Sequence, residues 1–100
     1  MKAYIVSFID VHDEVLYQKY VERAPQTIVR YGGQYVARNG TKHAIEGELP
    51  NNRVVLMEFP SVEKAKEWYH SAEYQEVVKI RHSASSGKIF IIEGPTQPVI

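Results

Sequence analysis

Two segments of the chain are apolar at almost every position, and we expect both to form central strands of a sheet. The first runs from Ala3 to Ile9, and the second runs from Arg53 to Phe59 with Glu58 as the polar residue within it. Strands that are apolar on both parities are typical of sheets covered on both faces. We therefore expect both faces of this sheet to be covered, by helices of the chain or by another molecule.

A helical pattern follows the first strand. Asp13 is a suitable N-cap, and apolar residues then recur at helical spacing, namely Leu16, Tyr20, Val21 and Ala24. Pro25 has no amide hydrogen and clashes with the preceding helical turn, so we expect a break near Ala24 and a second segment to Tyr31. Gly32-Gly33 is expected to end that segment.

A hairpin signal lies in the middle of the chain. Residues Gln34 to Arg38 have a strand pattern, and Asn39-Gly40 after them is typical of a type I′ turn, whose two central residues need positive φ. We expect Thr41 to Ile45 to pair back as a short strand. The polar stretch from Gly47 to Asn52 is expected to be a loop.

The second half of the chain contains two further helix starts. Ser61 is expected to cap a helix whose apolar residues share one side, namely Val62, Ala65, Trp68 and Tyr69. Ser71 is expected to cap another helix, from about Ala72 to His82. A loop from Ser83 to Gly87 then leads to a last strand, Lys88 to Glu93.

The predicted order is β-α-β-β-α-β with a short extra hairpin strand, which is the ferredoxin-like arrangement of an α+β protein. Its helices cover one face of an antiparallel sheet, so the other face is normally polar. Here both faces are predicted to be apolar, because the first strand has Ala3, Ile5 and Ile9 on one parity and Tyr4, Val6 and Phe8 on the other. A second copy of the chain is the simplest cover. We therefore expect a homodimer in the form of a dimeric α+β barrel.

The length of 100 residues suits one domain, which we place at residues 1–94. Residues 95–100 are expected to be a tail, in which Pro98-Val99-Ile100 can clamp onto a partner.

Composition excludes several classes of protein. Twelve basic and twelve acidic side chains cancel, which removes the basic excess that nucleic-acid binding needs. The first apolar run is much shorter than a membrane span and lacks an export signal, so we expect no membrane partner and a cytoplasmic location. The absence of cysteine excludes disulfides and thiolate chemistry.

Several stretches of the chain together form a recognisable set. They are Ala24 to Arg38, Glu58-Phe59-Pro60-Ser61 and Trp68-Tyr69-His70-Ser71-Ala72-Glu73-Tyr74-Gln75, together with Arg81 and Gly87. With these residues the chain, from Tyr4 to Gly94, resembles the domain-of-unknown-function family 1330. Ala72 stands where that family commonly has proline. The resemblance implies the dimeric α+β barrel and says little about activity, because a shared fold is weak support for a shared function.

Glu58 is the first candidate for chemistry, because an unpaired carboxylate in a buried strand is costly. Arg38 ends the neighbouring strand and can supply a fork of donors. One interpretation is a structural Glu58–Arg38 ion pair. In the other, Glu58 is a catalytic proton acceptor whose pKa is raised by desolvation, and Arg38 binds an anionic substrate group.

An aromatic set on the helices, with one arginine, supplies candidate substrate-binding residues. Tyr17, Tyr69 and Tyr74, with Trp68, are either core residues or the walls of a polar-rimmed pocket for a small, flat organic compound. Arg81 shares a helical side with Tyr74, and it either extends over the core or binds a carboxylate.

No metal or other cofactor is predicted. The four histidines, His12, His43, His70 and His82, have no spacing that places two ligands on one helical turn.

Three functions remain open from the sequence. The first is a small dimer that binds an organic metabolite and turns it over without a cofactor. The second is a ligand-sensing or accessory dimer without catalysis, and the third is a purely structural dimer.

Overall fold

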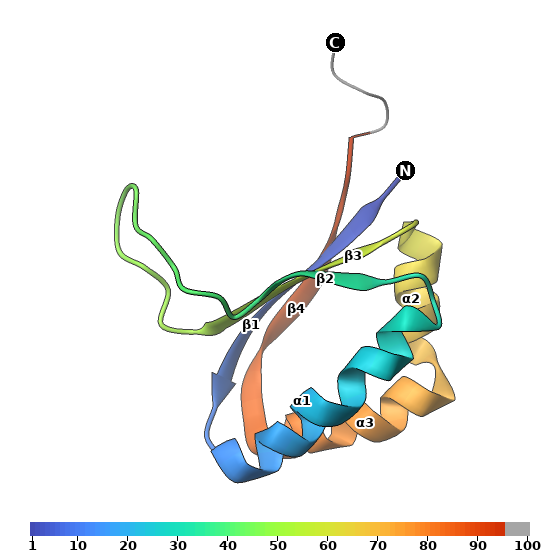
Figure 1. Cartoon of the computed structure of the whole chain (residues 1–100), viewed down its shortest axis with the longest axis horizontal. Coiled ribbons are helices and arrows are strands. Elements are labelled where there is room, and N and C mark those ends of the chain that lie inside the picture. Colours follow the sequence, from blue (N-terminus) through green and yellow to red (C-terminus); the bar gives the residue numbers. More distant parts are fainter. Residues whose placement is uncertain (96–100) are drawn as a thin grey trace.

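The computed structural model describes residues 1–95, which fold into a four-stranded antiparallel sheet with three helices on one face (Figure 1). The elements in chain order are β1 (Ala3–Val11), α1 (Glu14–Val29), β2 (Gln34–Arg38), β3 (Arg53–Phe59), α2 (Val62–His70), α3 (Ala72–Ala84) and β4 (Ser85–Glu93). The strand order is β2-β3-β1-β4, and every neighbouring pair is antiparallel. The predicted ferredoxin-like α+β fold is therefore confirmed.

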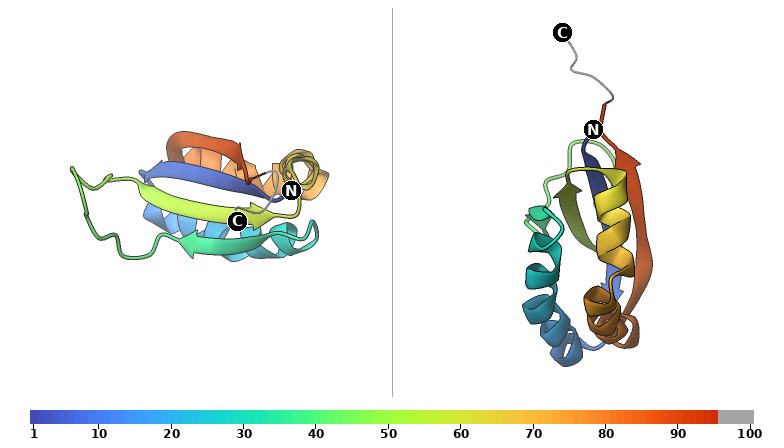
Figure 2. Two further views of the ribbon diagram at one scale, coloured as in Figure 1. Left: turned by 90° about the horizontal axis from the view of Figure 1, so that it is seen from above. Right: turned by 90° about the vertical axis from the view of Figure 1, so that its right-hand side faces the viewer.

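Each central strand has one buried parity and one that faces away from the helices. On β1, Ala3, Ile5, Ser7 and Ile9 are buried beneath the helices. The same holds for Val55, Met57 and Phe59 on β3. Seen from above, the sheet lies in front of the helices, so its other face is uncovered within the chain (Figure 2).

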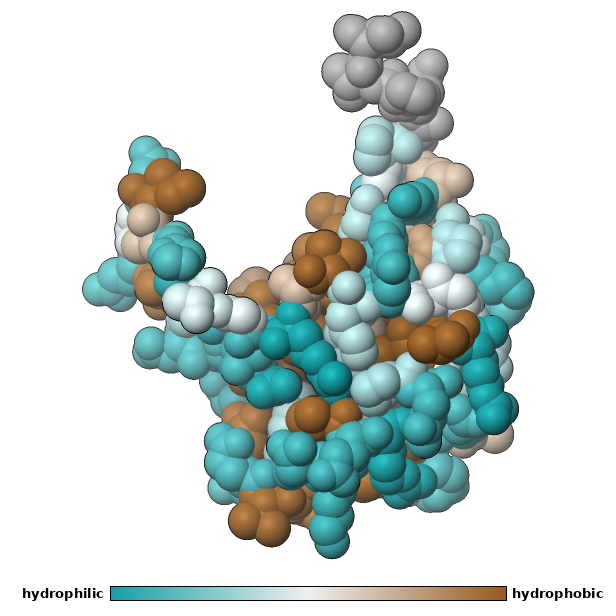
Figure 3. Space-filling view, viewed as in Figure 1, coloured by the Kyte–Doolittle hydropathy of each residue, from teal (hydrophilic) through white to brown (hydrophobic). Residues whose placement is uncertain are grey.

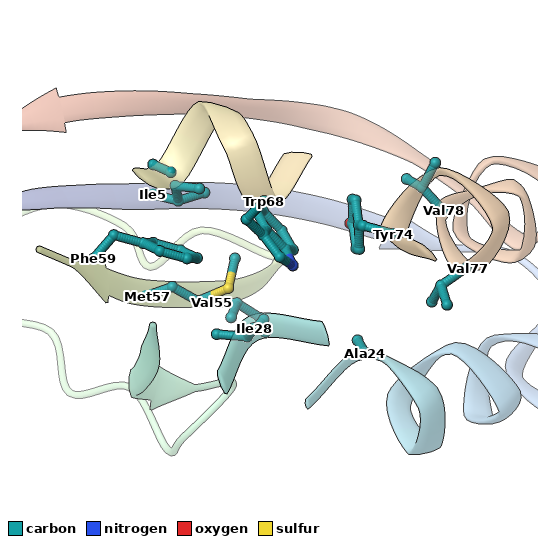
Figure 4. Close-up of a cluster of buried hydrophobic side chains, with 11 residues drawn as sticks. Ile5, Ala24, Ile28, Val55, Met57, Phe59, Trp68, Tyr74, Val77 and Val78 are labelled. Carbon is teal, nitrogen blue, oxygen red and sulfur yellow. The ribbon is translucent and has the colours of Figure 1, made fainter. Parts of the chain in front are cut away.

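The hydrophobic core lies between this buried parity and the helices, with Trp68 at its centre (Figure 4). The Trp68 ring lies 4.0 Å from the Tyr74 ring and 5.4 Å from the Phe59 ring, centroid to centroid. Its indole Nε1 donates to Thr27 Oγ1 across 2.9 Å, and that hydroxyl in turn donates to the Ala24 carbonyl. This chain of bonds ties α2 to α1 inside the core.

The uncovered face of the sheet, here called the open face, is apolar as predicted. Cross-strand register places its side chains in rows, with Leu56, Val6 and Phe90 in one row and Glu58, Tyr4 and Ile92 in another. Phe90 and Ile92 are about half exposed. Single exposed apolar residues are ordinary, but adjacent rows of them mark a surface that another molecule covers.

The predicted break at Pro25 is wrong, because α1 continues through this residue to Val29. Proline removes the hydrogen bond that its own amide would make to the carbonyl four residues earlier, here that of Val21. Arg38 fills this vacancy, since its Nη2 donates to the Val21 carbonyl across 2.6 Å. The expected end at Gly32-Gly33 is confirmed, and Gly32 has a φ of +77°.

The predicted return strand over Thr41 to Ile45 does not form, and residues 39–52 make one long loop between β2 and β3. Asn39 adopts a φ of +53°, but Gly40 does not have the positive φ that a type I′ turn needs. The loop leaves the body on the side away from the helices (Figure 1) and carries exposed apolar side chains, Ile45 and Leu49 (Figure 3).

The predicted loop from Ser83 to Gly87 is also absent, because β4 begins at Ser85 directly after α3. The Ala84 carbonyl at this junction accepts hydrogen bonds from the amides of His12 and Asp13. The expected clamp of Pro98-Val99-Ile100 lies outside the described residues. None of the described helices is long and apolar enough to cross a membrane.

Candidate functional site

A polar pocket lies between the sheet and the helices α1 and α3. Its lining residues come from all four strands and both helices: Ser7, Ile9, Tyr17, Tyr20, Val21, Tyr35, Arg38, Arg53, Val55, Met57, Arg81 and Ile89. The enclosed space measures about 20 Å³, which is room for about one water molecule. This pocket is here called the arginine pocket, after the three arginines among its lining residues.

Three arginines line this pocket, and no aspartate or glutamate lines it. Arg38 is at the end of β2, Arg53 at the start of β3 and Arg81 on the inward side of α3. None of the ion pairs found within residues 1–95 includes any of them. The pocket therefore has a positive charge that no acidic side chain of residues 1–95 neutralises in an ion pair.

Arg81 is the most buried of the three arginines, with 7% of the residue exposed. Its Nε atom is buried without a hydrogen-bond partner, and so is the Nε atom of Arg53. Buried polar atoms in folded proteins almost always have a partner. Two arginines that line one pocket and each have such an atom favour a site that takes an acceptor from outside the chain.

Arg38 is held by two contacts at the edge of the pocket. Its guanidinium lies over the Tyr35 ring, with Cζ 4.3 Å from the ring centroid, and it bonds the Val21 carbonyl that Pro25 leaves free. A fixed guanidinium loses little freedom when it binds an anion. The helical proline thus positions a cation of the site.

Tyrosines supply neutral donors around these cations. Burial raises the pKa of Tyr17, although Arg53, Arg81 and Arg38 each act in the opposite direction. Burial also raises the pKa values of Tyr35 and Tyr74, and it raises that of Tyr20 well above the ordinary value. All four phenols therefore stay protonated at neutral pH and can donate hydrogen bonds, but none is a base there.

Tyr74 lies behind the pocket wall rather than on it. Its hydroxyl is 2.6 Å from that of Tyr20, which does line the pocket, and its phenol oxygen helps to raise the pKa of Arg81 against the effect of burial. Tyr69 lines a separate shallow groove beside β4, with Lys66, His70 and Phe90. Of the predicted binding residues, the structure thus brings together Tyr17, Arg38 and Arg81 and places Tyr74 next to them, while Tyr69 lines the other groove with its ring 5.7 Å from that of Tyr74.

The predicted Glu58–Arg38 ion pair is wrong. Glu58 lies on the open face, where Lys2 Nζ is 2.8 Å from its Oε1 and Gln34 Nε2 donates to its Oε2 across 2.7 Å. These hydrogen bonds from Lys2 and Gln34 lower the Glu58 pKa, opposite to the predicted rise. Glu58 is therefore an ionised carboxylate outside the arginine pocket.

Four polar residues of the pocket were not among the predicted site residues, namely Ser7, Tyr20, Tyr35 and Arg53. Arg53 shares the parity of Val55 and Met57 on β3, and Tyr20 lies three residues after Tyr17 on α1. Both positions follow from strand and helix periodicity. A search for polar residues on the buried parity would have found Arg53.

Metal chemistry has no candidate in the described part of the chain. Within residues 1–95, no three or more histidine, aspartate or glutamate side chains gather closely enough to hold a metal ion.

The family model for DUF1330, a domain of unknown function, matches residues 2–95. This chain belongs to the DUF1330 family. The resemblance drawn from Trp68 to Gln75 and the other family residues is thereby confirmed. No curated protein matches the chain.

Solved structures show the same fold in proteins of very different sequence. The RPA0582 protein of Rhodopseudomonas palustris superposes with a TM-score of 0.76 at 19% identity, over 97% of this chain and 84% of that one. SnoaB, a cofactor-independent oxygenase from Streptomyces nogalater, gives 0.69 at 11% identity, over 96% and 95%. A Bordetella bronchiseptica protein assigned as an antibiotic biosynthesis monooxygenase gives 0.68 at 17%, over 94% and 97%. At these identities the likeness is one of fold.

The arginine pocket can therefore bind and polarise an anion, but it holds no group that takes a proton at neutral pH. Its lining contains no carboxylate and no histidine. Guanidinium and phenol donors stabilise negative charge on a bound molecule. The lining of this pocket can therefore stabilise negative charge, and it offers no group that takes up a proton at neutral pH.

Proposed function

We propose that this DUF1330 protein is a homodimer in which each subunit binds a small organic metabolite in the arginine pocket. The observation that carries the proposal is that two arginines lining one pocket, Arg53 and Arg81, each have a buried Nε atom without a hydrogen-bond partner. The likeness in fold to a cofactor-independent oxygenase makes turnover without a cofactor the catalytic form of this proposal.

The dimer part of the proposal rests on the open face. Its apolar rows on β1, β3 and β4 have no cover within the described chain. The loop of residues 39–52 projects on the same side, away from the helices (Figure 1), and carries hydrophobic surface (Figure 3). Ile45 on this loop is 95% exposed. A second copy that packs its own open face here buries both apolar features in an isologous contact.

The ligand part rests on the composition of the pocket. Its lining combines cations and hydroxyl groups with five apolar residues, namely Ile9, Val21, Val55, Met57 and Ile89. Pockets that combine a few polar groups with apolar walls are typical of small-molecule sites. Positive charge then favours ligands with an acidic group.

The small enclosed volume supports a second candidate, a purely structural dimer. A space of about 20 Å³ admits about one water molecule, so a metabolite enters only if wall residues move. In the structural alternative the side chains of the chain itself fill the pocket in all states.

Native mass spectrometry of gently purified protein tests both parts of the proposal. We expect a species of two 11.5 kDa chains that carries added mass from bound small molecules. A monomer would overturn the dimer. A dimer that never carries added mass, even after incubation with extracts of small molecules, would favour the structural alternative.

A further inference from the structure

Two arginine side chains of the pocket indicate the chemical class of its ligand. The Nε of Arg53 and the Nε of Arg81 are both buried and unpartnered. Each guanidinium presents Nε and one Nη as a pair of parallel donors in a plane. Carboxylates match that pair of donors with their two oxygens, whereas a neutral carbonyl group offers only one oxygen.

The position of Tyr17 joins the two arginines into one site. Its ring is buried, and the Cζ atom of Arg53 lies 5.2 Å from its centroid. Arg53, Arg81 and Arg38 all lie close enough to act on its phenol. An acceptor placed beside the Tyr17 hydroxyl therefore lies in the positive field of these three arginines and next to one neutral donor.

We propose that the ligand of the arginine pocket is a small organic carboxylate, whose oxygens are held by Arg53 and Arg81 beside the Tyr17 hydroxyl. This inference rests on the proposed function and names the class of its ligand. The carbon skeleton of the acid lies against Val55, Met57 and Ile89, the apolar part of the lining. A planar, unsaturated skeleton suits the aromatic walls that Tyr17, Tyr20 and Tyr35 provide.

The edge strand β2 is the part of the wall that can move to admit such an acid. It has five residues, and it pairs with β3 alone across an irregular register between Tyr35 and Ala37. Tyr35 and Arg38, which line the pocket, both belong to it. Within the proposal, admission of the acid involves this edge strand, whereas Ser7, Ile9 and Arg53 belong to the central strands β1 and β3.

The experiment compares acids with amides of the same shape. Formate, acetate and benzoate are titrated into the full chain, and so are formamide, acetamide and benzamide, at constant ionic strength set with sodium chloride. The arginine Nε–Hε resonances are followed by nitrogen-edited NMR. Arg53→Gln identifies one of these resonances by its loss, and Arg23→Gln, which changes an exposed arginine of α1, is the matched control.

We expect the acids to shift the Arg53 and Arg81 Nε–Hε resonances in a saturable manner and the amides to leave them unchanged. Arg53→Gln is expected to weaken the binding of the best acid at least tenfold, and Arg23→Gln to leave it unchanged. Amides that shift the two resonances as strongly as the acids would overturn the carboxylate class and leave the proposed pocket function standing. If neither series shifts them, both the carboxylate class and the binding function of the pocket are contradicted.

Discussion

The guanidinium of Arg38 donates a hydrogen bond to the carbonyl of Val21, across 2.6 Å, at the position where Pro25 leaves that carbonyl without its helical partner. A residue that normally interrupts a helix therefore creates an acceptor, and the acceptor fixes a cation beside the arginine pocket. Pro25 and Arg38 are 13 positions apart in the sequence. The proline explains why the Val21 carbonyl lacks a helical partner, and the arginine supplies the donor that this carbonyl needs.

A double-mutant cycle tests this relationship. Arg38→Met removes the donor and should cost about 1.5–3 kcal/mol of unfolding free energy, the range for a hydrogen bond to a charged group. Pro25→Ala returns an amide hydrogen that can bond the Val21 carbonyl. In that background we expect Arg38→Met to cost about 1 kcal/mol less, measured by urea denaturation. Equal costs in both backgrounds would show that the proline and the arginine act independently.

The arrangement of β2 explains why the sequence predicted the fold better than the site. Periodicity predicted the four strands of the sheet and the apolar character of both of its faces, but it also predicted a strand over Thr41 to Ile45 that does not form. In an uninterrupted strand, Gln34 and Arg38 share a parity, and Arg38 lies on the same face as Glu58. The register shift between Tyr35 and Ala37 pairs Arg38 with Val55 instead and turns it toward the pocket.

One extra residue in a strand exchanges the two faces for everything after it. No local signal in Gln34 to Arg38 marks the register shift. The sequence alone therefore favours a Glu58–Arg38 ion pair that the structure does not contain. The same limit applies to Pro25. Its local preference favours a break, and only a donor from a distant strand, Arg38, makes a continuous helix possible.

The hydrogen bond between Trp68 and Thr27 gives a second prediction, which concerns the stability of the hydrophobic core. Thr27→Val keeps the shape of the side chain but leaves the buried Trp68 Nε1 without an acceptor, which should cost about 1–3 kcal/mol. Thr27→Ser keeps the hydroxyl and is the matched variant, so it should retain the bond. The fluorescence of the single tryptophan follows unfolding in urea. A smaller loss for the valine variant than for the serine variant would contradict the assigned bond.

The pH dependence of stability tests the position of Glu58. Hydrogen bonds from Lys2 and Gln34 lower its pKa from the ordinary 4.5 in the folded chain. A lowered carboxylate pKa stabilises the fold above the ordinary pKa, and this contribution is lost as pH falls through the folded value. The melting temperature of Glu58→Gln should therefore lie below that of the wild type at pH 7, and the difference should shrink below pH 4.5.

Glu46→Gln, which changes an exposed glutamate of the 39–52 loop, is the control for this series and should follow the wild type. Glu58→Gln should also bind acids as the wild type does, because Glu58 lies outside the arginine pocket. Loss of ligand binding in this variant, with its melting temperature unchanged, would support the predicted role of Glu58 at the functional site and contradict its position outside it.

The proposed dimer predicts that substitutions of two exposed apolar residues differ strongly in their effect on dimerisation. Phe90 on the open face is 47% exposed, and Val15 on α1 is 81% exposed. Phe90→Lys places a charge in both halves of an isologous interface, so it should weaken dimerisation by more than tenfold, which is about 1.4 kcal/mol. Val15→Lys should leave the dimer intact. Sedimentation equilibrium measures both, and equal behaviour of the two variants would contradict an open-face dimer.

The central claim is that Arg53 and Arg81 hold an organic acid in the arginine pocket. The most direct test is to identify, by mass spectrometry, the small molecules released on denaturing the wild-type protein and Arg53→Gln, both purified in parallel in buffers free of organic acids. The account predicts a carboxylic acid that is enriched in the wild type and in Arg23→Gln and depleted in Arg53→Gln. A bound compound without an acidic group, or the same acid at equal amounts in Arg53→Gln, would contradict it.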